Sequence, residues 1–435
     1  MTARARERAL DVGLLFAAKG LIGAWVLARG FSHVSDDDYA RTVIAELFAH
    51  APRLDPSGTS WLPFPFWLTG AAMMAFGRSL ATARGVALVS GVAVVALPYL
   101  TLRSVGVARW SAVVGVLVAM ATPWSAWLGV ATVPEALSAG LVAAGAFAVA
   151  SAPSPWLGAA LLGAALSRYE AWPACAVAAS AACWSARTPE NRGRAALTSL
   201  LAAAGPLAWI AWNLHAHGDA FNFFSRVARY RQTVGAQDVP FLDKLSAYPM
   251  ALVRGAPEIA ALAAIALFSL GDRAMRARWR GPLGVAAAIV LFLVYGDLKD
   301  GAPTHHPERA LLGVWWILAA FGVDGARAAI GSVTRRRPKR EAWAVALATA
   351  ALVTCGARVV RAYDLYPARA LDEQRDSQVA RGRELRREGA PALVVTPCAY
   401  EHFALVAAYG APERVITREP SGLRGRLGCP GIEVR

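Results

Sequence analysis

Three consecutive carboxylates, Asp36, Asp37 and Asp38, follow directly on the first long apolar segment of the sequence. One acid is enough to cap a helix that begins there, so the run exceeds what capping requires. Repulsion between neighbouring carboxylates makes each a better proton acceptor, which favours general-base chemistry. With Glu135, which follows Pro134, the three acids are also candidate ligands for a divalent cation such as Mg²⁺ or Mn²⁺. The structural alternative is a solvated run of acids that only caps the helix.

Arg168 and Glu170 interrupt an otherwise apolar region. Placing a charged side chain at bilayer depth costs roughly several kcal/mol unless the charge is paired or faces water. Such residues are therefore functional candidates by default. The alternative is a structural pair between Arg168 and Glu170, or a side chain that reaches the interface from a helix end.

A second polar cluster occupies residues 297–309, where five of thirteen residues are formally charged. Arg309 and one of the two histidines, His305 or His306, are candidates for binding phosphate or an acceptor. Adjacent histidines lack the i, i+4 spacing with which helical ligands share a metal, so a zinc site is only weakly supported. A plain polar loop is the alternative.

The elements around the acids are predicted to lie along the membrane surface. Apolar residues recur at helical spacing after the acids, which predicts an amphipathic interfacial helix. The next apolar segment, 61–77, contains Pro63 and Pro65 among aromatic residues. Because prolines break helices and Trp is enriched at membrane interfaces, 61–77 is predicted to be interfacial or re-entrant, with a twelfth span as the alternative.

The composition indicates an all-α, multi-pass membrane protein. Of 435 residues, 56% are hydrophobic and only 17% are charged. The apolar residues form blocks whose usual length suits a bilayer crossing. The first block shows no cleavage site and is interpreted as the first span. Eleven spans are predicted, at about 10–29, 84–102, 109–127, 134–150, 156–167, 170–186, 195–214, 252–271, 281–297, 309–329 and 342–360.

The net charge of +15 is explained by membrane topology. With a cytoplasmic N-terminus in the cell (inner) membrane, the arginine-rich segments all lie inside and the acids gather outside, as the positive-inside rule requires. Counting 61–77 as a span would invert every later basic loop. The distribution therefore places the loop 30–83 outside, and no nucleic-acid partner is expected.

The composition changes after the last span, so the chain is divided into a transmembrane domain, 1–360, and a tail, 361–435. The tail predicts a solvated helix within 361–389, a strand at 392–396, a helix at 400–409 and a strand at 414–417. Eleven spans place this small α/β domain outside the cytoplasm. Disulfides form there, and a Cys398–Cys429 bridge is predicted.

Residues 35–77 resemble the GT-C superfamily of polyprenyl-phosphate-dependent glycosyltransferases, which includes protein O-mannosyltransferases and lipid A aminoarabinose transferases. The resemblance rests on the acids after the first span, the amphipathic helix, and the Pro- and aromatic-rich segment that ends in Phe76-Gly77. It implies an outward-facing site with a polyprenyl-phosphate-sugar donor. It also implies a catalytic aspartate, Asp37 first and Asp36 second, and a donor-phosphate role for Arg168. The family commonly has Asp-Glu where this chain has three aspartates.

The function expected is sugar transfer from a polyprenyl-phosphate donor to an acceptor hydroxyl of a lipid, glycan or protein, beside the membrane lipids. The alternative from another class is a transporter or lipid flippase. A transporter predicts inverted repeats and broken helices that meet near mid-membrane, whereas the acids here lie in an outer loop and no repeat is evident. An inactive scaffold is the third possibility. No ATPase-type phosphate loop, G-x-S-x-G motif or CxxC pair occurs.

Overall fold

The computed structural model of the chain describes residues 2–233, 239–301, 306–333, 366–395, 402–417 and 433–434, with isolated residues between 346 and 360. The described part is mainly helical. Its α-helices are α1 (Ala3–Ala28), α2 (Asp37–His50), α3 (Phe64–Phe76), α4 (Leu80–Ala93), α5 (Ala96–Ser104), α6 (Arg109–Met120), α7 (Pro123–Leu128), α8 (Glu135–Ala148), α9 (Pro155–Ala165), α10 (Trp172–Ser185), α11 (Arg192–His217), α12 (Asn222–Thr233), α13 (Phe241–Gly255), α14 (Pro257–Leu267), α15 (Arg273–Leu298), α16 (Pro307–Ala310), α17 (Leu312–Val333), α19 (Asp372–Arg387) and α20 (His402–Tyr409).

The chain is a multi-pass membrane protein. By length and composition, four described helices can cross a bilayer: Ala3–Ala28, Leu80–Ser104, Pro189–His217 and Arg273–Leu298. A fifth span arises if the pair Phe241–Gly255 and Pro257–Gly271, bent by 95°, counts as one. Helices lie at ten of the eleven predicted segments, several shorter than a full crossing. The eleventh segment, 342–360, lies largely outside the described residues.

The segment predicted to be interfacial forms the short helix α3. Its 13 residues span about 20 Å, less than the roughly 30 Å of a hydrocarbon core. Pro63 occupies its N-cap and Pro65 lies in its first turn, where the missing N–H costs little. Gly70 lets α3 approach α2, because a Cβ there would lie 3.0 Å from the carbonyl oxygen of Ala45. The placement of α3 relative to the membrane stays a prediction.

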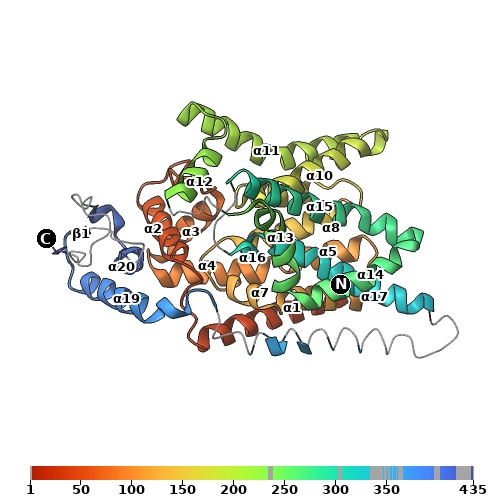
Figure 1. Cartoon of the computed structure of the whole chain (residues 1–435), viewed down its shortest axis with the longest axis horizontal. Coiled ribbons are helices and arrows are strands. Elements are labelled where there is room, and N and C mark those ends of the chain that lie inside the picture. Colours follow the sequence, from red (N-terminus) through yellow and green to blue (C-terminus); the bar gives the residue numbers. More distant parts are fainter. Residues whose placement is uncertain are drawn as a thin grey trace.

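The long helices share one direction, and the C-terminal unit (366–395, 402–417 and 433–434) lies at one end of them. In Figure 1, α1 runs along the lower edge from the N-terminus toward this unit, and α11 runs along the upper edge. The helices α2, α3 and α4 lie between the unit and the rest of the molecule. The number of spans and the side of the membrane on which each end lies stay predictions.

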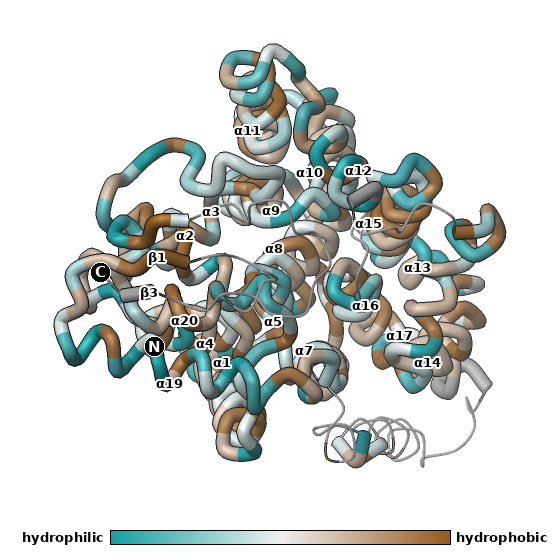
Figure 2. The backbone as a smooth tube through the Cα atoms, turned by 60° about the vertical axis from the view of Figure 1, so that its left-hand side comes forward, coloured by the Kyte–Doolittle hydropathy of each residue, from teal (hydrophilic) through white to brown (hydrophobic). Residues whose placement is uncertain are grey.

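The C-terminal unit has the predicted α/β composition. Strands β1 (Leu393–Val395), β2 (Val415–Thr417) and β3 (Glu433–Val434) form a sheet of order β2-β1-β3. β1 pairs in parallel with β2 and antiparallel with β3. The mostly hydrophilic α19 and the apolar α20 precede and follow β1 (Figure 2). Both cysteines of the predicted disulfide, Cys398 and Cys429, lie outside the described residues.

Candidate active site

Asp38 has a structural role at the start of α2. Its side chain is buried, and one carboxylate oxygen accepts hydrogen bonds from the backbone N–H groups of Val34 (3.0 Å) and Ser35 (3.4 Å). The other oxygen accepts from the backbone N–H (2.8 Å) and the hydroxyl (3.2 Å) of Thr132. Asp38 thus joins the start of α2 to the segment before α8. Each of its carboxylate oxygens already accepts two hydrogen bonds, which leaves no acceptor site for a substrate.

Replacing Asp38 by Ala is expected to lower the free energy of unfolding by about 2–4 kcal/mol, because it leaves buried N–H donors unsatisfied. The thermal unfolding midpoint in detergent measures this, with Asp55→Ala, in the loop before α3, as the control. A variant that melts like the wild type would contradict the structural role.

Asp36 faces the C-terminal unit. It occupies the N-cap position of α2, yet its side chain caps no helix N–H. Both its oxygens bind the guanidinium of Arg375, from Nε at 2.6 Å and from Nη2 at 2.9 Å. Such a two-pronged pair is among the stronger ion pairs in proteins and fixes both side chains. The second candidate base is therefore already paired.

Asp37 is the acid that faces the inner cluster of charges. Its Oδ2 accepts a hydrogen bond of 2.9 Å from Nη1 of Arg309, and its side chain is 38% exposed. Burial disfavours the charged form, but the guanidinium groups of Arg309 and Arg41 outweigh it and hold the pKa of Asp37 below its usual value. The expectation that crowding makes the acid more basic is thus wrong for Asp37, because arginines rather than carboxylates dominate its surroundings.

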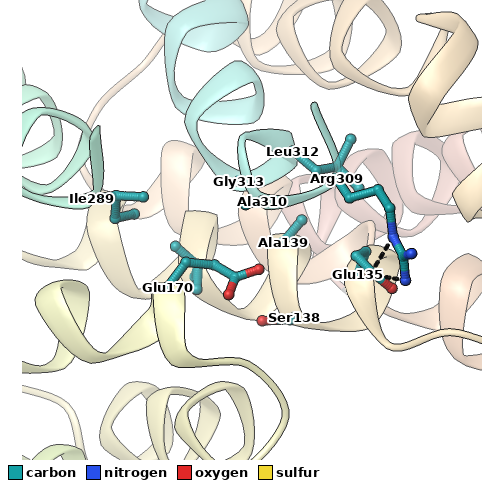
Figure 3. Close-up of a pocket in the computed structure, with 10 residues that line it drawn as sticks. Glu135, Ser138, Ala139, Glu170, Ile289, Arg309, Ala310, Leu312 and Gly313 are labelled. Carbon is teal, nitrogen blue, oxygen red and sulfur yellow. Dashed lines mark hydrogen bonds and ion pairs between the residues drawn. The ribbon is translucent and has the colours of Figure 1, made fainter. Parts of the chain in front are cut away.

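Glu135 joins the two predicted phosphate-binding arginines. The carboxylate, fully buried at the start of α8, accepts a hydrogen bond of 2.8 Å from Nε of Arg309 and lies 2.7 Å from its Nη2 (Figure 3). The same oxygen lies 3.1 Å from Nη1 of Arg168. Arg168 also binds Glu170 through Nε at 2.6 Å, so the pair offered as its structural alternative exists as well. Residues from α8, α16 and the turn before α10 therefore meet at one place.

A small pocket opens beside this ion pair. Ser138, Glu170, Ile289 and Gly313 contribute to its lining, and Figure 3 shows Glu170 and Arg309 on different sides of it.

Arg41 belongs to the same cluster, although the sequence did not single it out. The side chain is buried and packs on the rings of Trp61 (4.4 Å) and Phe66 (5.6 Å). Its Nε and Nη1 have no hydrogen-bond partner among the described residues. Burial lowers the pKa of Arg41 to about 10, so it stays charged at neutral pH. The available signal was its spacing: Arg41 follows Asp37 by four residues, one turn along the same helical face.

The structure places some of the remaining predicted site residues elsewhere, and one of them is not described. The ring of His306 packs against Trp124, with centroids 5.6 Å apart, while His305 lies outside the described residues. Asp36, Asp37 and Asp38 bind Arg375, Arg309 and Thr132, so they point to three different partners. Within the described ranges, no three His, Cys, Asp or Glu side chains are grouped to hold a metal ion. A role for Mg²⁺ or Mn²⁺ stays an untested prediction.

No family model and no curated protein matches the sequence. Among solved structures, the chain is similar to apo ArnT from Cupriavidus metallidurans, with a TM-score of 0.54 and 15% identity over 96% of this chain and 90% of that chain. It is also similar to ArnT bound to undecaprenyl phosphate, with a TM-score of 0.56 and 16% identity over 94% and 89%. At such identities the similarity shows the fold. The chain therefore shares the fold of these ArnT structures, which agrees with the resemblance carried by the loop after its first apolar segment.

Proposed function

We propose that this protein is a membrane glycosyltransferase that moves a sugar from a polyprenyl-phosphate donor to an acceptor hydroxyl at the outer face of the membrane. The observation that carries the proposal is the convergence of Arg41, Arg168 and Arg309 beside Asp37. Guanidinium groups bind phosphate through paired hydrogen bonds, and the fold is one that has been solved with undecaprenyl phosphate in ArnT.

The free donors of Arg41 support a place for the donor phosphate in this cluster. Arg168 and Arg309 already share Glu135, whereas two N–H groups of Arg41 lack an acceptor. A buried donor without an acceptor costs about 1–3 kcal/mol, which a phosphate oxygen would recover on binding. Arg41 therefore contributes donors that no described residue satisfies, and Arg168 and Arg309 contribute further positive charge beside it.

Asp37 has the position and exposure of the acid that receives the acceptor. Its partly exposed carboxylate would accept the hydrogen bond of the acceptor hydroxyl and then its proton, while the hydroxyl oxygen attacks the anomeric carbon. The bond from that carbon to the phosphate oxygen breaks, and the arginines stabilise the charge that develops on the departing polyprenyl phosphate. A phosphate that draws Arg309 away from Asp37 would also raise the basicity of Asp37.

Replacing Arg41 by Met is expected to weaken donor binding by roughly tenfold to a hundredfold, because hydrogen bonds to a charged phosphate are lost. The stability of the unliganded protein should be unchanged or higher, since a buried guanidinium with unmet donors is removed. Undecaprenyl phosphate binding and thermal unfolding midpoints in detergent measure the two effects. Arg226→Met, which removes another outer-loop arginine, is the control. Equal donor affinity in wild type and Arg41→Met would exclude Arg41 from the phosphate site.

The function is tested by sugar transfer from radiolabelled polyprenyl-phosphate sugars to cell-envelope acceptors. Membranes that contain the protein should transfer label, and membranes without it should not. Screening several donors in parallel identifies the sugar. Absence of transfer from every donor, with folded protein present, would contradict the proposal.

A further inference from the structure

The helix α2, which begins within the acidic run, packs against two different parts of the molecule. On one side, Tyr39 and Val43 of α2 belong to the same buried cluster as Leu393 and Leu405 of the C-terminal unit. On its other side, α2 packs against α3. The C-terminal unit therefore supplies part of the packing that fixes α2, and it cannot move away without exposing this apolar face.

The first turns of α19 hold the residues just before α2. Arg375, itself buried, binds both oxygens of Asp36. Asp372 accepts a hydrogen bond of 2.7 Å from the hydroxyl of Ser32 and lies 3.4 Å from Nδ1 of the buried His33. Two residues one helical turn apart on α19 thus fix both ends of the segment from Ser32 to Asp36.

Asp37 is therefore held through its two neighbours. Asp36 is fixed by Arg375 from the C-terminal unit, and Asp38 by Thr132 from the segment before α8. With both adjacent side chains anchored to opposite parts of the molecule, the backbone of Asp37 has little freedom, and its carboxylate points to Arg309.

We infer that Arg375 is a positioning residue for the transfer reaction: by binding Asp36 it sets the start of α2 and leaves Asp37 as the acid that faces the arginines. The inference rests on the proposed function and deepens it. It gives the C-terminal unit a role in positioning the active site. It also explains why three acids are present, since each one has a separate partner.

The kinetic test compares Arg375→Gln, Asp36→Asn and the reciprocal exchange of Asp36→Arg with Arg375→Asp, with Arg381→Gln as the matched control. Arg381 lies on the same helix, is half exposed and, among the described residues, forms its ion pair with Glu384 one turn away. Displacement of a reacting group by about 1 Å costs on the order of 10²-fold in rate, so both single variants should lose about 10- to 100-fold in kcat. Donor KM should stay within about threefold, because the phosphate-binding arginines are unchanged.

The exchange and the double variant separate positioning from chemistry. The reciprocal exchange should recover most of the lost kcat although position 36 then has no carboxylate, and Asp36→Asn with Arg375→Gln should be no worse than either change alone. If Asp36 were the base, Arg375→Gln would free its carboxylate and preserve transfer. The reciprocal exchange, which removes the carboxylate from position 36, would then fail to restore the transfer lost in Asp36→Asn. That pattern would overturn the inference.

Backbone amide hydrogen exchange gives a second measurement that does not depend on activity. In Arg375→Gln, exchange of the amides of residues 35–40 should increase at least tenfold relative to wild type and Arg381→Gln, while α15 stays protected. Unchanged hydrogen exchange in these residues would contradict the positioning role of Arg375 even if kcat fell. If wild-type membranes transfer no sugar, the proposed function fails. The hydrogen-exchange measurement alone then decides whether Arg375 fixes the segment before α2.

Discussion

Replacing Asp37 by Asn is expected to lower sugar transfer by roughly 10²- to 10⁴-fold, the usual contribution of a general base. Of the three acids, Asp37 alone combines partial exposure with a direct bond to the arginine cluster. Its lowered pKa keeps it ionised at neutral pH, so an acceptor hydroxyl meets a carboxylate rather than an acid. Initial rates at saturating radiolabelled donor measure the loss.

The matched control for this prediction is Asp36→Asn, which should lose less because Asp36 acts through Arg375. Stability should change little in Asp37→Asn, since the side chain is partly solvated and an amide oxygen can still accept from Arg309. Donor binding should also persist. Full transfer by Asp37→Asn, with Asp36→Asn inactive, would assign the base to Asp36 instead.

The sequence predicted the helices and the acidic loop well because both leave local signals. Apolar length and arginine-rich ends locate spans without tertiary information. The pattern of the tail likewise predicted strands near Leu393 and Val415 and the helix between them, all confirmed. Span lengths were less predictable, because small residues permit short, bent and closely packed helices. Gly115, for example, faces the Cα of Ala320 across α6 and α17 at a distance that leaves no room for a Cβ.

The partners within the site were beyond local patterns. The sequence identified the candidates Asp37, Glu135, Arg168 and Arg309. It did not predict that Glu135 forms ion pairs with both arginines. These contacts join residues more than 30 positions apart, and a sequence without an alignment carries no record of such pairs. Arg41 and Arg375 were missed for opposite reasons: Arg41 resembles an ordinary polar position on an amphipathic helix, and Arg375 one charge among many on a solvated helix.

Replacing Arg309 by Leu is expected to cause the largest combined loss. Removing one partner of a buried ion pair typically costs about 3–5 kcal/mol, because the remaining charge stays buried. Glu135 is fully buried, and would keep only Arg168, which also binds Glu170. Donor binding should fall as well, since one of three phosphate-binding guanidinium groups is gone. Thermal unfolding midpoints and undecaprenyl phosphate binding measure the two losses.

A second substitution separates these two effects of Arg309. Combining Arg309→Leu with Glu135→Leu removes both buried charges, while Arg168 retains Glu170 and the partly exposed Asp37 is solvated. Stability should therefore recover to within about 1–2 kcal/mol of wild type, as apolar replacement of whole buried pairs often allows. Transfer should remain at least about 10²-fold below wild type, because the charge that stabilises the departing phosphate is still missing. A stable double variant with normal transfer would mean that Arg309 and Glu135 serve folding alone, and the phosphate site would then consist of Arg41 and Arg168.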